Sequence, residues 1–484
     1  MKFRNVLSSY FQPTYEWIPT VKNPTLDSSI NSLTFEYAGR LLLRHEISID
    51  ESHFQQLLSN QYFQEINPFD RLPRGYRCRR CGNKASHLFS TFPCSVCEEE
   101  HHYCRSCIEM GRVSDCEKLY MWTGPDPNWA EIEKPCQWNG ELTAAQSGAS
   151  ERFIEAIREK QELLLWAVCG SGKTEMVFPG IGFALEQGLR VCLATPRVDV
   201  VRELLPRFQA AFPNVSIAAL YGGSTDKNLA SPLVLATTHQ LLRYANAFDV
   251  MIIDEVDAFP FHHSKTLPYA TNRAVKPTST TVYLTATPRK DLKRRMTRKE
   301  LDTVFVPTRY HGHPLPVPSM RMCWDLKKAR SIHSPPKAFF QWFTRRKNPN
   351  RQLLIFVPTI EIAERLRNTL QTKDNFMNQK IESVYSSDPE REEKVEHFRN
   401  KEYNIMITTT ILERGVTFPS VDVTILDAGH EVFDEAALVQ IAGRAGRNAN
   451  DPDGEVVFYH DGRTEAMVKA IQSIKEMNKR GGFK

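Results

Sequence analysis

The chain has 484 residues, enough for about two to four domains of ordinary size. It carries 62 Lys and Arg against 57 Asp and Glu, so the net charge is only +5 and any nucleic-acid surface must come from local clusters rather than a global basic field. The N-terminal stretch lacks the apolar run of a signal peptide, and no 18-residue apolar window predicts a membrane span. We therefore expect a multidomain cytoplasmic protein.

The first 140 residues divide by composition into two parts. Residues 1–70 mix short apolar stretches with Pro and Asn and indicate no role. Residues 71–140 are rich in cysteine, and tryptophan and proline are frequent there. In a reducing compartment, clustered cysteines are typically metal ligands or thiols rather than disulfides. The sequence therefore predicts a small cysteine-rich module at 71–140.

This module contains three Cys-x2-Cys pairs, "CRRC", "CSVC" and "CRSC". Paired thiolates at this spacing can hold one tetrahedral Zn²⁺ from a tight turn. The predicted metal ligands are Cys78, Cys81, Cys94, Cys97, Cys104 and Cys107.

The three pairs supply six thiolates, which is more than the four ligands of a single zinc site. We favour a primary site made by the first and third pairs over the ribbon-like combination of the first two. A second site would need Cys116 together with His101 or His102. The sequence leaves open whether the module holds one zinc ion or two.

From residue 141 onward, short apolar strands alternate with helical patterns, which predicts an α/β fold with parallel sheets. The predicted strands are "LRVCLAT", "SPLVLATT", "DVMIIDEVD" and "TVYLTAT", and after a Pro-rich passage at 309–320 "QLLIFVPT", "YNIMITTT" and "VDVTILDA". Ligands bind at the carboxyl ends of strands in such sheets. We predict one α/β domain at 141–309 and a second at 310–484.

A phosphate-binding loop is predicted by "AVCGSGKTE", which follows the apolar run "ELLLW". Glycines let successive backbone N–H groups turn toward an anion, and a following helix points its positive end at the same place. The lysine can reach the outer phosphates and the threonine hydroxyl can ligand Mg²⁺. The predicted loop residues are Gly170, Ser171, Gly172, Lys173 and Thr174. Ala167 occupies the position where the usual pattern begins with glycine.

Two adjacent carboxylates, Asp254 and Glu255, end the strand "VMIIDEVD". Phosphoryl transfer relies mainly on positioning and charge neutralisation. Asp254 can hold the Mg²⁺ that bridges the nucleotide phosphates, and Glu255 can orient and deprotonate the attacking water. The sequence therefore predicts an ATP-hydrolysing site.

These motifs resemble, in the expected order, those of the superfamily 2 helicases and translocases over residues 141–460. The resemblance implies two RecA-like domains with ATP between them. In "LTAAQ" it implies an adenine contact by Gln146, and in "TATP" at 285–288 a motif that couples hydrolysis to domain movement. The nucleic-acid contacts that it implies are Arg197 and Thr237 in the first domain, and Thr409 and Arg414 of "TTTILERGVTFP" in the second.

The segment "QIAGRAGR" resembles the last motif of that superfamily and adds Gln440, Arg444 and Arg447 to the predicted catalytic residues. Because the two arginines are three positions apart, they would project from nearly one face of a helix. Guanidinium forks bind phosphate oxygens with fixed geometry, and such arginine fingers raise turnover by roughly 10³ to 10⁵. We expect the second domain to present both arginines to the nucleotide.

A cysteine-rich module directly ahead of "LTAAQ" and a DEAD-type motor resembles the ComFA competence ATPases of Gram-positive bacteria. In the related PriA helicases the zinc ligands instead interrupt the motor. The resemblance implies ATP-driven translocation on single-stranded DNA during uptake of transforming DNA. It implies a ComFC-like phosphoribosyltransferase protein as a partner, with DprA and the membrane channel ComEC as further ones. It also implies a location at the inner face of the membrane.

Two other functions compete with this interpretation. A duplex-unwinding helicase of the replication-restart type, or an RNA helicase, would carry the same motor motifs, because strand separation needs a wedge that these motifs do not reveal. A zinc-dependent adaptor with a degenerate motor is disfavoured by the intact Lys173, Asp254, Glu255, Arg444 and Arg447.

Overall fold

The computed structural model describes residues 28–226, 229–326, 334–414 and 418–483. The first 27 residues of the predicted N-terminal region and residues 415–417 of "TTTILERGVTFP" lie outside the described residues. The chain divides into two units. The first comprises residues 1–140, 150–163 and 177–283, and the second comprises residues 141–149, 164–176 and 284–484.

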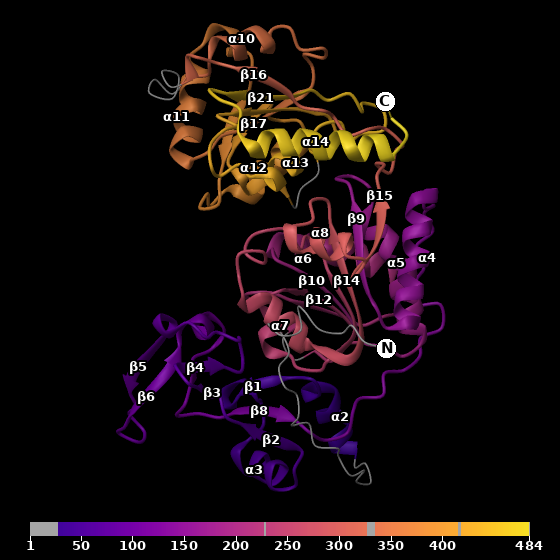
Figure 1. Cartoon of the computed structure of the whole chain (residues 1–484), viewed down its shortest axis with the longest axis vertical. Helices are drawn as coiled ribbons and strands as arrows, with labels where there is room; N and C mark the ends of the chain where they lie inside the picture. The colour runs from indigo at the N-terminus through magenta and orange to yellow at the C-terminus, as the bar shows by residue number, and fades with distance from the viewer. Residues whose placement is uncertain (1–27, 227–228, 327–333, 415–417, 484) are drawn as a thin grey trace. The chain divides into compact units, whose positions relative to one another are not determined.

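The N-terminal lobe of the first unit is a three-stranded antiparallel sheet packed against two helices (Figure 1). Its elements are α2 (Ser28–Tyr37), β1 (Leu41–Leu43), the 3-10 turn η1 (Arg44–Glu46), α3 (Glu51–Ser59), β2 (Phe63–Ile66) and β8 (Leu119–Trp122). Strand β8 lies between β1 and β2 and pairs with both. Tyr37, Phe54, Phe63 and Trp122 form the centre of its core. The lobe is therefore closed by a strand that follows the cysteine-rich segment.

The cysteine-rich module is inserted between β2 and β8. Its elements are β3 (Phe69–Leu72), β4 (Gly75–Cys78), η2 (Ser86–Leu88), β5 (Phe89–Pro93), β6 (Glu100–Cys104), η3 (Arg105–Met110) and β7 (Val113–Ser114). β3 pairs with β4, and β5, β6 and β7 form a second small antiparallel sheet. Apart from cysteines, the buried apolar side chains between residues 67 and 118 are Pro68 and Val113. The module therefore buries few apolar side chains of its own.

A seven-stranded sheet follows, with the strand order β11-β12-β10-β13-β14-β9-β15. Its strands are β9 (Glu162–Ala167), β10 (Val191–Thr195), β11 (Ile217–Leu220), β12 (Leu233–Thr237), β13 (Phe248–Ile253), β14 (Val275–Thr285) and β15 (Asp302–Val306). The intervening helices are α4 (Ala144–Glu159), α5 (Lys173–Glu186), α6 (Val198–Ala211), η5 (Gln240–Arg243), α7 (Thr266–Ala274) and α8 (Lys290–Thr297). Pairing among β10 to β14 is parallel. The predicted α/β fold is confirmed.

The second unit contains a six-stranded parallel sheet with the order β16-β21-β20-β17-β19-β18. Its strands are β16 (Ser319–Met322), β17 (Gln352–Phe356), β18 (Ile381–Val384), β19 (Ile405–Thr408), β20 (Val421–Leu426) and β21 (Val456–His460). Its helices are α10 (Lys337–Phe343), α11 (Ile360–Gln371), η6 (Asp374–Phe376), α12 (Arg391–Arg399), η7 (Thr410–Glu413), α13 (Glu435–Ala442) and α14 (Glu465–Arg480).

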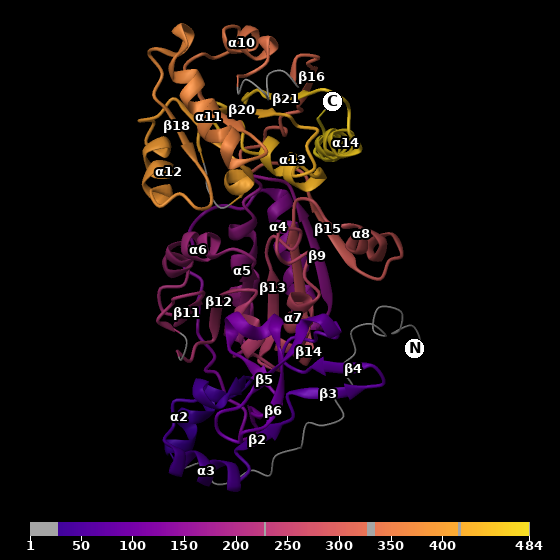
Figure 2. The same cartoon turned by 90° about the vertical axis from the view of Figure 1, so that its left-hand side faces the viewer.

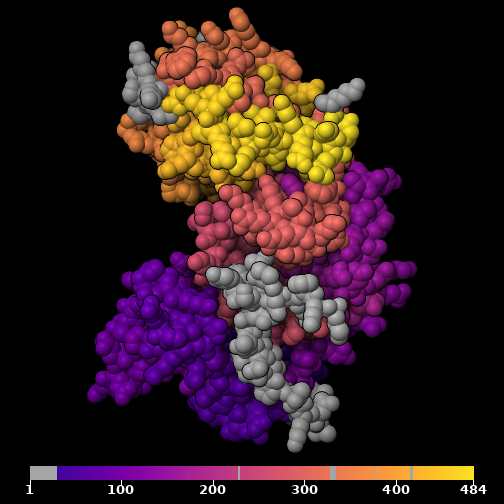
Figure 3. Space-filling model, in the orientation of Figure 1, coloured from indigo at the N-terminus to yellow at the C-terminus, as the bar shows by residue number. Residues whose placement is uncertain are grey.

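Successive residues of these strands supply two separate cores, because side chains alternate between the faces of a sheet. Leu354 and Phe356 pack with α12, α13 and α14, whereas Leu353 and Ile355 pack with α10 and α11. The helices therefore cover both faces of the sheet (Figure 2). The outer side of α14 forms part of the surface of this unit (Figure 3).

Glu46 links three parts of the first unit. Its carboxylate accepts hydrogen bonds from Arg80 Nη2 of the cysteine-rich module at 2.7 Å and from Arg243 Nε of η5 at 2.6 Å. It also accepts from the backbone N–H of Leu43 at 2.9 Å. Burial alone would raise the pKa of Glu46, but the guanidinium of Arg80 and the N–H of Leu43 together lower it below its ordinary value. Because the Arg80 side chain is fully buried, Glu46 supplies the countercharge that it needs.

We predict that Glu46→Gln lowers the free energy of unfolding by about 3–5 kcal/mol, because it leaves the Arg80 charge buried without a countercharge. Urea unfolding at pH 7 measures the loss. A lowered pKa in the folded state means that this stabilisation is present above the ordinary pKa of glutamate and is lost as the pH falls through the lowered value. The difference in the free energy of unfolding between wild type and Glu46→Gln should therefore become smaller as the pH falls.

The matched control is Glu51→Gln. Glu51 pairs with Arg44 at 2.9 Å, but its side chain is 64% exposed. An exposed pair of this kind contributes about 0–1 kcal/mol. Equal losses in the two variants would contradict the role assigned to Glu46.

Candidate nucleotide site and metal centre

The phosphate loop connects the end of β9 to the start of α5. Gly170 and Gly172 have φ angles of 77° and 70°, which residues with a side chain adopt only with strain. Helix α5 begins at Lys173, so its N-terminal dipole is directed at the loop, as the sequence predicts. The loop therefore has the backbone geometry of an anion-binding turn.

Gln146 at the start of α4 holds this loop from one side. Its Nε2 donates to the carbonyl oxygen of Ser171 at 2.7 Å, and its Oε1 accepts from the N–H of Thr143 at 2.7 Å. A Cβ atom on Gly172 would collide with the same Nε2. Gln146 is 4% exposed, so its amide group is held in place by the surrounding residues. Glycine at position 172 leaves the space that this amide group occupies.

The loop and its surroundings fit a nucleoside triphosphate with Mg²⁺. The Ser171 hydroxyl is fully buried, and among the described residues it has no hydrogen-bond partner. Lys173 and Thr174, which follow it, are half-buried. An unpaired hydroxyl beside a lysine and a threonine supplies the donor set that phosphate oxygens and a hard cation require.

Asp254 and Glu255 follow β13, which lies between β10 and β14 in the first unit. The N–H of Asp254 donates to the carbonyl of Ala194 at 2.8 Å, so the residue continues the line of the strand. Glu255 has a φ of 52°, and its N–H donates to Asp254 Oδ1 at 2.9 Å. Glu255 thus occupies a left-handed backbone position, the kind of strained conformation that clusters at functional sites.

Gln440 on α13 meets the phosphate loop within the second unit. Cys169 Sγ donates to Gln440 Oε1 at 3.0 Å, and a Cβ atom on Gly443 would collide with the Cys169 side chain. Gln440 Nε2 is buried and has no hydrogen-bond partner among the described residues. Helix α13, which precedes the two arginines, thus offers an unpaired donor next to the phosphate loop.

The arginines of this motif do not lie on a helix, so that part of the prediction was wrong. Helix α13 ends at Ala442, and Arg444 and Arg447 lie in the turn that follows. Gly443 caps the helix, and Gly446 has a φ of 64°, which a continuing helix excludes. Arg444 is buried and its Nε donates to the carbonyl of Glu413 at 3.0 Å. Arg447 is half-buried and its Nε donates to the carbonyl of Gly443 at 3.1 Å.

Arg309 and Tyr310, at the start of the Pro-rich passage, connect the phosphate loop with the arginine turn. The N–H of Tyr310 donates to the carbonyl of Gly170 at 2.9 Å, and its hydroxyl donates to the carbonyl of Arg447 at 3.4 Å. Buried Arg309 donates to the carbonyls of Ala445, at 2.8 Å, and Gly446. Nothing in the local sequence separates these residues from an ordinary linker.

The predicted nucleic-acid contacts lie at the carboxyl ends of strands in each unit. In the first unit, Arg197 precedes α6, while Thr237 ends β12 and pairs in register with Thr195 of β10. In the second unit, Thr409 follows β19, and Arg414 follows η7. Thr237 and Arg414 are buried, and Arg414 Nε pairs with Glu413 at 3.3 Å. Arg197 and Thr409 are half-buried and are the more accessible members of the set.

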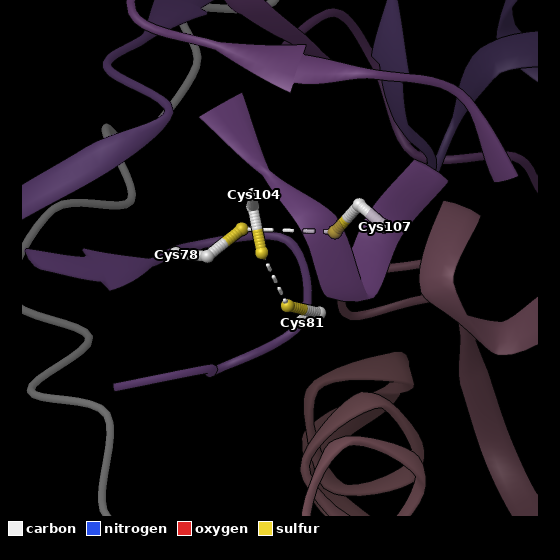
Figure 4. A group of neighbouring side chains, drawn as sticks. All are labelled: Cys78, Cys81, Cys104 and Cys107. Atoms are coloured by element: carbon white, nitrogen blue, oxygen red, sulfur yellow. Dashed lines mark hydrogen bonds between the residues drawn. The ribbon is translucent and has the colours of Figure 1, made fainter. Parts of the chain in front are cut away.

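The first and third cysteine pairs converge in the cysteine-rich module (Figure 4). The two closest approaches between sulfur atoms are 3.7 Å, from Cys78 to Cys107, and 3.5 Å, from Cys81 to Cys104. Tetrahedral Zn²⁺ with Zn–S bonds of about 2.3 Å separates its sulfurs by about 3.8 Å. All four cysteines are buried, so this set could hold a structural zinc ion. Cys94, Cys97 and Cys116 form a separate group.

Comparison with known proteins gives three matched families along the chain. Residues 28–121 match the competence protein ComFA N-terminal domain, residues 139–290 the type III restriction enzyme res subunit, and residues 336–449 the helicase conserved C-terminal domain. Among solved structures, the DEAD-box helicase Mss116 bound to single-stranded RNA and UDP-BeF has a TM-score of 0.52 at 15% identity, over 72% of this chain and 84% of that one. Fold and site define an ATP-dependent enzyme of helicase superfamily 2.

Two relatives identify the family to which the chain belongs within this class. The competence protein ComFA of Bacillus subtilis strain 168 is 45% identical over 95% of this chain and 97% of its own length. That of Streptococcus pneumoniae R6 is 36% identical over 93% of this chain and its full length. The chain belongs to the ComFA family of competence proteins. No helix among the described residues is long and apolar enough to cross a membrane.

We predict that Gly172→Ala weakens nucleotide binding by at least about tenfold, or about 1.4 kcal/mol. The added methyl group meets Gln146 Nε2 and forces a positive φ on alanine, so the loop must deform. Titration with a fluorescent ATP analogue measures the affinity. Gly148→Ala is the control, because a Cβ on this glycine of α4 has no neighbour within 4 Å. Unchanged affinity in Gly172→Ala would contradict the assignment of the loop.

Proposed function

We propose that the chain is an ATP-driven translocase on single-stranded DNA that powers uptake of transforming DNA during competence. Its membership of the ComFA family supports a role in competence, and its helicase-type sheets support coupling of ATP hydrolysis to movement. The main supporting observation is the hydrogen bond from Cys169, beside the phosphate loop, to Gln440 on the helix before the arginine turn. Through this contact, a change at the nucleotide would reach α13, which packs on the C-terminal sheet.

In the proposed reaction, Lys173 and the Ser171 hydroxyl bind phosphate oxygens. Thr174 and Asp254 hold Mg²⁺, which neutralises charge on the phosphates. Glu255 accepts the proton of the attacking water as its oxygen bonds to the terminal phosphorus and the bond to the leaving diphosphate breaks.

The arginine turn then stabilises the charge that develops on the phosphate. Arg444 and Arg447 must exchange their present carbonyl partners for phosphate oxygens. This exchange is favoured because a guanidinium binds an anionic oxygen more strongly than a neutral carbonyl. The same step moves the turn relative to the nucleotide, which makes it the proposed link between hydrolysis and motion.

Each unit also contributes one threonine and one arginine to the proposed DNA track: Thr237 with Arg197, and Thr409 with Arg414. Hydroxyl and guanidinium groups bind phosphates without reading bases. Alternating grip by the two sets would move the protein along a strand of any sequence. The cysteine-rich module is proposed to hold zinc through its first and third pairs. Binding to a ComFC-like protein, DprA or ComEC stays a prediction.

We predict that single-stranded DNA stimulates the ATPase rate more than duplex DNA or RNA does. Rates are compared side by side with the three polymers at equal nucleotide concentration and fixed salt, because phosphate contacts are salt-dependent. Displacement of streptavidin from a biotinylated single strand reports translocation. A tailed duplex should stay paired. Unwinding of that duplex would favour the restart-type helicase, stimulation by RNA alone would favour an RNA helicase, and no stimulation by any polymer would contradict the proposal.

We predict that Arg447→Ala leaves ATP affinity within about tenfold but lowers DNA-stimulated turnover on the order of a thousandfold, the scale lost with an arginine finger. Lysine at this position should not restore turnover, because a point charge lacks the bidentate fork. Steady-state ATPase and nucleotide titration measure the two effects. Arg399→Ala, which removes an exposed arginine of α12 paired with Glu396, is the control. Normal stimulated turnover in Arg447→Ala would contradict the coupling mechanism.

A further inference from the structure

A second cluster of thiols lies in the cysteine-rich module, apart from the four buried cysteines. Cys94 and Cys97 lie in the turn between β5 and β6, and Cys116 follows β7. Cys94 Sγ is 3.4 Å from Cys116 Sγ, and Cys97 Sγ is 4.0 Å from it. A disulfide would require about 2.05 Å between sulfurs, so these residues are separate thiols.

His101 is the candidate fourth ligand of this group, through its contact with Cys97. His101 of β6 places its Nε2 atom 3.0 Å from Cys97 Sγ. A tetrahedral zinc site with three sulfurs and one nitrogen has S–S separations of about 3.8 Å and S–N separations of about 3.6 Å, from bond lengths of about 2.3 and 2.0–2.1 Å. The two S–S distances are within about 0.4 Å of the tetrahedral value, whereas the Cys97–His101 distance is about 0.6 Å shorter than the tetrahedral S–N value. The three thiols lie within 4.8 Å of one another without His101, so metal binding requires the imidazole to move from Cys97 toward the centre of the group.

Asp115 fixes the orientation of the His101 ring. Asp115 Oδ1 lies 3.0 Å from His101 Nδ1, which leaves Nε2 facing the thiols. A carboxylate that accepts from the second ring nitrogen is the usual outer partner of a zinc-binding histidine. The neighbouring His102 also approaches Asp115, with its Nδ1 3.4 Å from Oδ2, but its ring packs beside Tyr76 at 5.0 Å between centroids and contacts no thiol among the described residues. The structure thus distinguishes the two histidines that the sequence left equivalent.

We infer that Cys94, Cys97, His101 and Cys116 form a second zinc site, interleaved along the chain with the first. The second pair of cysteines and His101 lie between the two pairs of the first site, and Cys116 lies beyond them. Each metal ion therefore links segments of the chain that the other ion does not link. This arrangement explains how a module that buries few apolar side chains folds, since metal binding supplies folding free energy. The inference does not rest on the proposed motor activity.

The two sites differ in exposure. All four cysteines of the first site are buried, whereas Cys97 and Cys116 of the second are exposed. We expect a chelator to remove the second ion faster than the first, because solvent and chelator reach it directly.

The test is zinc content per full-length chain after purification without added metal, measured by mass spectrometry of the element. Wild type should hold two ions, His101→Ala one, and Cys78→Ser one. His102→Ala is the matched control and should retain two, because His102 has the same chemistry at the adjacent position but no thiol contact. One ion in wild type, or equal zinc loss in the two histidine variants, would overturn the inference.

A second readout does not depend on how the variants fold. Native wild-type chain is treated with iodoacetamide, and the alkylated cysteines are identified by mass spectrometry with and without chelator. Cys94, Cys97 and Cys116 should be protected until chelator is added, although two of them are exposed. Rapid alkylation of all three without chelator would overturn the second site. Cobalt substitution adds a spectroscopic check, since His101→Ala should remove the absorption bands of the site with mixed sulfur and nitrogen ligands and leave those of the all-sulfur site.

Discussion

The candidate nucleotide site depends on hydrogen bonds that hold the phosphate loop from residues outside it. A loop rich in glycine is flexible, and ordering it costs conformational entropy. Here the carbonyl of Ser171 accepts from Gln146, and the carbonyl of Gly170 accepts from the N–H of Tyr310. The loop carbonyls therefore have fixed partners, which orders the turn before any anion arrives. A preorganised turn binds an anion more tightly, because the entropy has already been lost in folding.

The sequence predicts the parts of the site that carry local signals. Glycines that need a positive φ identified the phosphate loop, and apolar strands ending in polar residues identified the sheet edges where candidate residues lie. The arginine motif was recognised by its residues, but its conformation was not. The spacing of Arg444 and Arg447 is compatible with a helix, and only the glycines at 443 and 446 indicate the turn that the structure adopts.

Local sequence patterns do not predict contacts between residues that are distant in the sequence. Arg309 and Tyr310 bind the loop and the arginine turn, yet their own neighbourhood is that of a connection rich in proline. Likewise, nothing in "KLYMW" indicates that β8 would return to pair with β1 and β2. The partners of such residues are distant in sequence, so no local pattern specifies them. The candidate metal ligands are an intermediate case, because the spacing identifies the cysteine pairs and the structure shows which pairs lie together.

The position of the cysteine-rich module in the N-terminal sheet has a consequence for how such a chain is built. Ile66, the last residue of β2, is the direct antiparallel partner of Leu119, the first residue of β8. Neighbouring antiparallel strands are about 5 Å apart, a gap that a two-residue hairpin turn closes. The fifty-two residues between them, 67–118, thus leave and re-enter the sheet at one point. The module could be excised or exchanged as a single cassette while the strand register of the host lobe is kept.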